Sequence, residues 1–354
     1  MRVEDLDTPV LIIDLDALEE NLDRYQQYFD LHKVGFRPHI KTHKTLAIAH
    51  MQMARGAIGL TCQKLGEAEV MVWGGLNTDI LIPFNLLGRQ KLDRLTALAK
   101  CTSRLTVAVD SEQTVRGIAE AARAEGVTIG VLVEIETGSN RTGSTSPQKT
   151  LELARLIHER PGLELRGIMG FPTPPRVRPL LRETLDLFDR DGLPHPVVSG
   201  GSTPGALEAH EIPEVTEHRA GEYCVGGAGH LLQGRHTVAQ CALRALMTVV
   251  SRPSEGRAIL DGGSKTLSAS TLKVDQGESM GYIVEYPEAR FYGASEEHGH
   301  VDVSACAQKP EIGERVQVLP VHPCPCVNEH DELVAVRKGR VEAVWPVHAR
   351  GKIR

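Results

Sequence analysis

The strongest constraint on the fold of this chain is the alternation of short apolar runs with amphipathic segments along its first two thirds. The first run ends near Lys41. Seven more strand-like runs lie at residues 57–62, 79–83, 105–110, 128–136, 163–171, 195–200 and 214–219. Amphipathic stretches between them, at 88–101, 111–126 and 146–160, predict helices, because serine opens and glycine closes several of them. Eight such units predict an α/β fold with a (β/α)8 TIM barrel, and an open doubly wound sheet is the weaker alternative.

The two ends of the chain carry a different pattern. An acidic residue at Asp16 with Glu19 three positions later predicts a capping box and a helix that leads to the first strand. From about residue 241 short strands follow one another without helices, which predicts an antiparallel β domain. The apolar residues 8–14 are expected to add a strand to it. We therefore expect a barrel domain at 15–240, and a β domain from 1–14 and 241–354 that carries any metal site.

Charge and composition exclude several classes of partner. The 354 residues carry a net charge of −6 without a basic stripe, which argues against a nucleic-acid partner. No apolar run approaches the roughly 20 residues that span a bilayer, and the acidic residues 1–7 contain no apolar signal core, so we expect a soluble, cytoplasmic protein without a membrane partner. The seven cysteines are an odd number and scattered, so we expect reduced thiols.

The most reactive segment is RPHIKTHK at 37–44, which follows the first strand. Cations at the carboxyl edge of a barrel strand suit a reactive amine or an anion site, although a solvated basic loop is the commoner explanation for such a cluster. Strand seven leads into VSGGSTPG (198–205) and strand eight into RAGEY (219–223), the positions where barrels often hold phosphate. A lysine that faces a phosphate site suggests pyridoxal 5′-phosphate.

Seven motifs follow one another along the chain: RPHIKTHK (37–44), VEIETGSNRTG (133–143), VSGGSTPG (198–205), AGEY (220–223), DGGSKTLS (261–268), EEHGH (296–300) and PVHPCPCVN (320–328). In this order they resemble the motifs of the D-serine dehydratase and D-threonine aldolase family, the fold-type III pyridoxal-phosphate enzymes related to alanine racemase. Together they span nearly the whole chain. The resemblance implies a homodimer in which the partner's β domain covers each barrel mouth.

The resemblance also implies roles for individual residues. Lys41 is the expected Schiff-base and catalytic lysine, and Arg141 is expected near the phenolic oxygen of the cofactor. The phosphate is expected at Gly200, Gly201, Ser202, Gly221 and Tyr223. Phe171 stands where relatives usually have a tyrosine. The roles of His43 and Lys44 stay open between electrostatic support of Lys41 and contact with substrate.

A second candidate site consists of His322 and Cys324. On an extended segment, an imidazole and a thiolate one residue apart point to the same side, and together they favour zinc, with manganese or magnesium as alternatives. Alone this spacing is weak evidence, but in the resembled family a metal here is expected to bind the β-hydroxyl of the substrate. Cys326 is the rival ligand. If both cysteines bound, the site would be more typical of structural zinc.

These parts support two reactions on a D-3-hydroxy amino acid. A dehydratase would convert D-serine, D-threonine or 3-hydroxy-D-aspartate to a 2-oxo acid and ammonia, whereas an aldolase would release glycine and an aldehyde. Aldolases of the family tend to have aspartate in place of Cys324 and dehydratases cysteine, so we favour elimination. A racemase and a non-catalytic cofactor-binding protein are the remaining alternatives. No tyrosine motif supports the racemase, and the β domain argues against the cofactor-binding protein.

Overall fold

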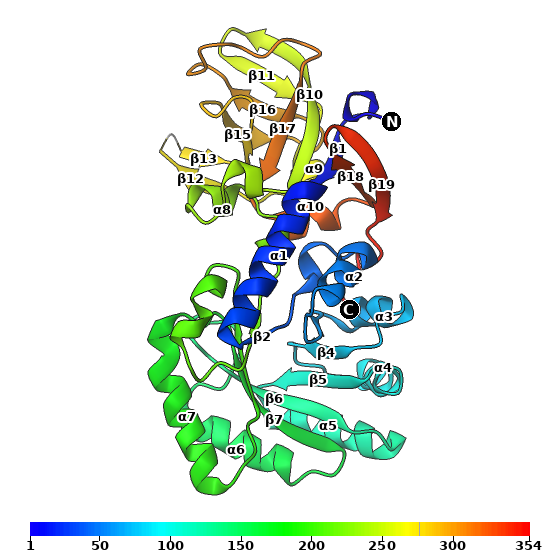
Figure 1. The fold of residues 1–354 in the computed structure, drawn as a ribbon, viewed down its shortest axis with the longest axis vertical. Coiled ribbons are helices and arrows are strands. Elements are labelled where there is room, and N and C mark those ends of the chain that lie inside the picture. The colour runs from blue at the N-terminus through cyan, green and yellow to red at the C-terminus, as the bar shows by residue number, and fades with distance from the viewer. Residues whose placement is uncertain (276) are drawn as a thin grey trace. The chain divides into compact units, whose positions relative to one another are not determined.

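The computed structural model describes residues 1–275 and 277–354. Its contacts divide the chain into two compact units. The barrel unit consists of Arg24–Lys41, Ile48–Gly221 and Lys352–Arg354, and the β-sheet unit of Met1–Asp23, Thr42–Ala47 and Glu222–Gly351. The RPHIKTHK motif is thus divided between the units after Lys41. Figure 1 shows the ribbon of each unit.

The barrel unit contains eight parallel strands in the order β2-β9-β8-β7-β6-β5-β4-β3. Their bounds are β2 Gly35–Phe36, β3 Leu60–Thr61, β4 Asp79–Ile82, β5 Arg104–Val109, β6 Ile129–Ile135, β7 Leu163–Gly170, β8 Val197–Gly201 and β9 Glu217–Arg219. The two end strands also meet, because Ile58 N–H donates to Phe36 O at 2.9 Å and Thr61 N–H to Pro38 O at 2.8 Å. The predicted eight-stranded barrel is confirmed.

Helices alternate with these strands, as the sequence predicts. Helix α1 (Leu15–His32) precedes β2, and a 3-10 helix (Ala206–Glu211) joins β8 to β9. The helices between the other strands are α2 Leu46–Ala54, α3 Leu65–Trp73, α4 Arg89–Ala99, α5 Glu112–Glu125, α6 Pro147–His158 and α7 Arg178–Asp191. Ser111 caps α5 by accepting the N–H of Thr114, and Gly126 ends it in the left-handed conformation with φ of 63°, which glycine adopts without strain. Every residue of β6 is buried, as expected for a parallel strand covered on both faces.

The predicted cap of the first helix is wrong, and the first strand ends at Phe36, directly before the RPHIKTHK motif as predicted, and does not extend to Lys41. Helix α1 begins at Leu15, and its cap is Asp14, whose Oδ1 accepts the N–H of Ala17 at 3.2 Å, so Asp16 lies inside the first turn. Strand β2 ends at Phe36, and Lys41 lies in a 3-10 turn (Ile40–Thr42). Pro38 interrupts the strand because it has no N–H to donate, although His39 N–H still bonds Ala220 O at 2.8 Å.

The β-sheet unit is built on a nine-stranded sheet with the path β15-β16-β11-β10-β1-β18-β19, and β17 joins β10 to β14. Its strands are β1 Val10–Asp14, β10 Leu243–Ser254, β11 Arg257–Leu260, β14 Gly281–Ile283, β15 Arg290–Ala294, β16 Gly299–Asp302, β17 Arg315–Pro320, β18 Glu332–Arg337 and β19 Arg340–Pro346. A separate hairpin joins β12 (Leu272–Val274) to β13 (Gly277–Ser279).

The N-terminal strand joins this sheet, as predicted, but the sheet is not wholly antiparallel. β1 runs antiparallel to β10 and parallel to β18, so the sheet is mixed. Three short helices also occur in this unit, where none was predicted: α8 (Ala228–Leu232), α9 (Ser264–Leu267) and α10 (Pro323–Asn328). No helix among the described residues is long and apolar enough to cross a membrane.

Candidate active site

In the barrel unit, Lys41 and Arg141 lie beside the same aromatic ring. The Nζ atom of Lys41 is 5.9 Å from the centre of the Phe171 ring, and the guanidinium carbon of Arg141 is 4.9 Å from it. Both distances are within reach of an attractive contact between a cation and a ring. The residue that replaces the usual tyrosine therefore still contacts both predicted cofactor residues, but it offers them no hydroxyl.

The loop after β6 is held by a carboxylate that the sequence analysis missed. Oε1 of Glu136 accepts the backbone N–H groups of Ser139 at 2.6 Å and Asn140 at 3.1 Å, and Oε2 accepts that of Arg141 at 3.1 Å. Burial raises the pKa of Glu136, but these backbone hydrogen bonds outweigh it, and the net pKa is lowered. The signal in the sequence was an acidic residue just before a Gly-Ser-Asn turn.

His39, within the lysine motif, is a neutral neighbour of Lys41. Its Nδ1 accepts the backbone N–H of Lys41 at 3.4 Å, so Nε2 carries the proton and donates to Gln63 Oε1 at 3.0 Å. Burial, followed by the charge of Lys41, holds the pKa of His39 well below its usual value. Lys41 therefore has fewer charged neighbours within the motif than the letters of the motif suggest.

The glycines at the end of β8 lie where a side chain would be tightly packed. A Cβ atom at Gly200 would lie 3.2 Å from Thr173 Oγ1, and one at Gly201 would lie 3.1 Å from Arg219 Nη2. The N–H of Gly201 already donates to Thr173 Oγ1 at 2.5 Å, and Ser202 O accepts a hydrogen bond from His218 Nε2 at 2.9 Å.

The predicted phosphate residues are distributed between strand ends. Gly200, Gly201 and Ser202 lie at the end of β8, and Gly221 follows β9. Tyr223 is a fully buried residue of the β-sheet unit. The amide of Gly201 is already bonded within the protein, so a bound phosphate would take its donors from other groups of these turns.

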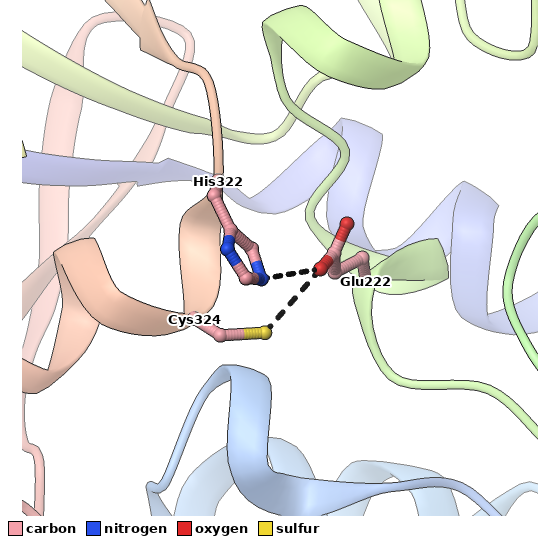
Figure 2. Close-up of side chains that lie close together, drawn as sticks. All are labelled: Glu222, His322 and Cys324. Carbon is pink, nitrogen blue, oxygen red and sulfur yellow. Dashed lines mark hydrogen bonds and ion pairs between the residues drawn. The ribbon is translucent and has the colours of Figure 1, made fainter. Parts of the chain in front are cut away.

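In the β-sheet unit, His322 and Cys324 converge on a third side chain, Glu222. Oε1 of Glu222 lies 3.0 Å from His322 Nε2 and 3.4 Å from Cys324 Sγ, and the three ligand atoms all lie within 4.8 Å of one another (Figure 2). The prediction that both residues lie on an extended segment is wrong. His322 is extended, but Pro323 starts helix α10 and places Cys324 in its first turn. His322 and Cys324 nevertheless point to one place.

The carboxylate of Glu222 is held from its other side as well. His230 Nε2 lies 2.6 Å from Oε2 of Glu222. Burial raises the pKa of Glu222, but hydrogen bonds from His230 and His322 outweigh it and leave the pKa well below its usual range. The sequence analysis missed Glu222 because it lies 102 residues from Cys324, although it belongs to the AGEY motif.

The donor set fits a zinc ion. Zinc bonds of about 2.0 to 2.3 Å in tetrahedral geometry place ligand atoms roughly 3.3 to 3.8 Å apart, close to the two short separations at Glu222. Three protein ligands leave one position open, as in catalytic zinc sites. Cys326 does not join them, because its thiol donates to Thr266 O at 3.2 Å and burial raises its pKa. Among residues 1–275 and 277–354, this is the one such group of three.

The second half of the lysine motif contacts the same helix. Thr42, the residue after Lys41, has its Oγ1 3.1 Å from Cys324 Sγ. Lys44 Nζ donates to Asn328 Oδ1 at 2.9 Å and to Ala349 O at 3.3 Å. Within the β-sheet unit, Lys44 therefore anchors the end of α10, and the two roles left open by the sequence stay predictions.

Comparison with known proteins identifies the family. The model of the alanine racemase N-terminal domain matches residues 13–229, and that of a serine dehydratase domain matches residues 242–336. The chain belongs to the alanine racemase-like D-serine dehydratase and D-threonine aldolase family. The resemblance of the seven motifs is thereby confirmed.

Members of this family similar to the chain include both aldolases and a dehydratase. The 3-hydroxy-D-aspartate aldolase of Paracoccus denitrificans (strain Pd 1222) is 31% identical, covering 99% of this chain and 94% of that protein. The D-threo-3-hydroxyaspartate dehydratase of Delftia sp. (strain HT23) is 32% identical, covering 90% of this chain and 91% of that protein. The crystal structure of D-threonine aldolase from Filomicrobium marinum is 35% identical over 99% and 97%, with a TM-score of 0.86.

Structures of D-threo-3-hydroxyaspartate dehydratase add one detail about metal. They include a variant of a histidine and a variant of a cysteine two positions later, and the cysteine variant is in a metal-free form. This spacing equals that of His322 and Cys324.

Proposed function

We propose that this chain is a pyridoxal-phosphate- and metal-dependent lyase that dehydrates a D-3-hydroxy amino acid to a 2-oxo acid and ammonia. The observation that carries the proposal is the convergence of Glu222, His322 and Cys324 at distances that suit a zinc ion. The alternative is aldol cleavage to glycine and an aldehyde, since similar relatives bear both names.

The residues of the barrel unit fit the cofactor. Lys41 would hold it covalently, Arg141 would lie near its phenolic oxygen, and the turns with Gly200, Gly201, Ser202 and Gly221 would take its phosphate. When bound, the cofactor withdraws electrons from the bonds at Cα of the substrate. Lys41 is the group we assign to accept the Cα proton. His39 supports this role because it is neutral and fixes the backbone of Lys41 by a hydrogen bond.

The residues of the β-sheet unit fit the metal. Glu222, His322 and Cys324 would hold it, and its chemistry there would be to polarise the β-hydroxyl as a leaving group. A thiolate among the ligands favours zinc over harder ions such as manganese and magnesium. The dehydratase whose cysteine variant is metal-free has the same spacing of histidine and cysteine, which supports elimination over aldol cleavage.

Incubation of the purified protein with D-serine, D-threonine and 3-hydroxy-D-aspartate tests the proposal. We expect a 2-oxo acid and ammonia from at least one of them. Glycine with an aldehyde would assign the alternative, and an L-enantiomer would assign a racemase. We also propose that the enzyme is a homodimer, and light scattering that finds an active monomer at the assay concentration would refute this.

A further inference from the structure

His230, on helix α8, is a buried histidine with no role in the chemistry above. Its side chain is 7% exposed, and its Nε2 lies 2.6 Å from Oε2 of Glu222. The other oxygen of the carboxylate, Oε1, faces His322 Nε2 at 3.0 Å and Cys324 Sγ at 3.4 Å. The two oxygens of Glu222 are therefore divided between a buried histidine and the candidate metal ligands.

The hydrogen bond to Glu222 is the one that orients the His230 ring. An ionised carboxylate only accepts hydrogen bonds, so His230 Nε2 carries the proton and donates. The opposite ring nitrogen, Nδ1, is buried and has no hydrogen-bond partner among the described residues. A buried polar ring with one unsatisfied nitrogen is a poor choice for packing alone, since an apolar side chain would avoid that cost. The contact with Glu222 is what a histidine gains here.

A fixed carboxylate is a better metal ligand than a mobile one. Free glutamate loses side-chain rotamers when it coordinates an ion, and a group already held in place loses less. Partners that orient a metal ligand typically change metal affinity by about 10- to 100-fold. His230 has the position for this effect, because it holds Oε2 and leaves Oε1 directed at His322 and Cys324.

We propose that His230 is a positioning residue for the metal centre: it holds Glu222 so that the carboxylate acts as a third protein ligand beside His322 and Cys324. The inference rests on the proposed metal centre. It adds that zinc affinity depends on a residue that does not itself touch the ion.

The test measures zinc affinity and not turnover. Full-length protein is freed of metal by dialysis against a chelator, and zinc binding is then measured by competition with a chromophoric chelator. His230→Phe keeps a buried ring but removes the donor, and we expect it to weaken zinc binding by about 10- to 100-fold. His230→Gln carries an amide donor and should restore most of the loss.

A double-mutant cycle separates positioning from general damage. In a Glu222→Ala background, His230→Phe should have little further effect on zinc affinity, because the carboxylate that it orients is gone. His330→Phe is the matched control. It removes another histidine contact of the same unit, from Nε2 to Thr266 O at 2.9 Å, and should leave zinc affinity unchanged.

The outcomes distinguish this inference from the function on which it rests. If His322→Ala and Cys324→Ala bind zinc like the unmodified protein, the metal centre itself is wrong. If those variants lose zinc while His230→Phe keeps full affinity, or loses as much in the Glu222→Ala background, the positioning role is wrong and the metal centre stands. Should His230→Phe not fold, His230→Met can be compared with His230→Gln instead. Methionine has no hydrogen-bond donor for Glu222, whereas glutamine has one.

Discussion

Each unit contains a cluster of charged and polar side chains, and the two clusters differ in the groups that lie against their carboxylates. In the barrel unit, Arg37 donates from Nε and Nη2 to Glu217 at 2.9 to 3.1 Å and from Nη1 to Asp79 at 2.9 Å. In the β-sheet unit, Glu222 faces His322 and Cys324, whose side chains are of types that can bind a metal ion. In the barrel cluster, the guanidinium of Arg37 supplies the positive charge opposite Glu217 and Asp79.

The difference separates a structural cluster from a functional one. Arg37 and Glu217 are almost fully buried, and Ser199 Oγ adds a hydrogen bond to Glu217 at 2.7 Å, so the charges are neutralised inside the protein. His322 is 48% exposed, and the atoms around Glu222 Oε1 have donor types that suit an external cation. A buried ion pair that is balanced internally is costly to break, whereas a convergent donor set facing solvent is suited to bind an ion.

The largest effect is expected at Lys41, which lies in the same motif as Arg37. Lys41→Ala should abolish turnover, because it removes the cofactor's anchor and the proposed proton acceptor together. The cofactor-free form of the variant should melt at a temperature close to that of the cofactor-free unmodified protein. Borohydride reduction of the holoenzyme should fix the cofactor's mass to the peptide with Lys41, and labelling at Lys44 or Lys265 would contradict the assignment.

Arg37→Met tests the structural side of the comparison. It leaves Glu217 buried without its cation, so we expect the free energy of unfolding to fall by about 3 to 5 kcal/mol, measured by urea denaturation. Arg155→Met removes the exposed ion pair with Asp191 and serves as the control, with no measurable change expected. Equal stability of the two variants would show that the barrel cluster is not a structural element.

A smaller effect is expected from pH through His218, also in the barrel unit. Burial lowers the pKa of His218 to about 4, from 6.5. Between these values the unfolded chain binds a proton that the folded chain does not, so stability falls as the pH drops from 6.5 to 4, by up to roughly 3 kcal/mol for this group. His218→Gln should show a shallower decline in urea denaturation across this window. An identical decline would contradict the prediction.

The smallest effect is expected at Cys326, two residues beyond the proposed ligand. Its thiol is buried and bonded to Thr266 O, so Cys326→Ala should lower the free energy of unfolding by only about 1 kcal/mol and leave zinc stoichiometry unchanged. Cys324→Ala should lose the metal. If zinc analysis gives the reverse result, the ligand assignment is wrong.

Most of the fold was predictable, because local patterns determine it. Alternating apolar runs located the eight barrel strands, and Ser111 and Ser146 marked helix starts by their capping chemistry. The parallel pairing of β1 with β18 was not predictable, since nothing local specifies a partner more than 300 residues away. The segment with His322 and Cys324 was expected to be extended, but proline is favoured in the first turn of a helix, and α10 begins at Pro323.

The candidate site was predictable only in part, for a similar reason. His322 and Cys324 are two residues apart, so their pairing could be read from the sequence. Glu222 and His230 approach them through tertiary packing alone. The hydrogen bond between Lys44 and Asn328 joins residues 284 positions apart, and no local sequence pattern indicated it.

The most direct test of the account is D-serine elimination before and after metal removal. We predict that the untreated enzyme forms pyruvate and ammonia, that chelation stops this while the absorbance of the bound cofactor persists, and that zinc restores it. The cofactor signal should survive because the proposed metal contacts the leaving group and not the cofactor ring. Full activity after rigorous metal removal, confirmed by elemental analysis, would contradict the central claim.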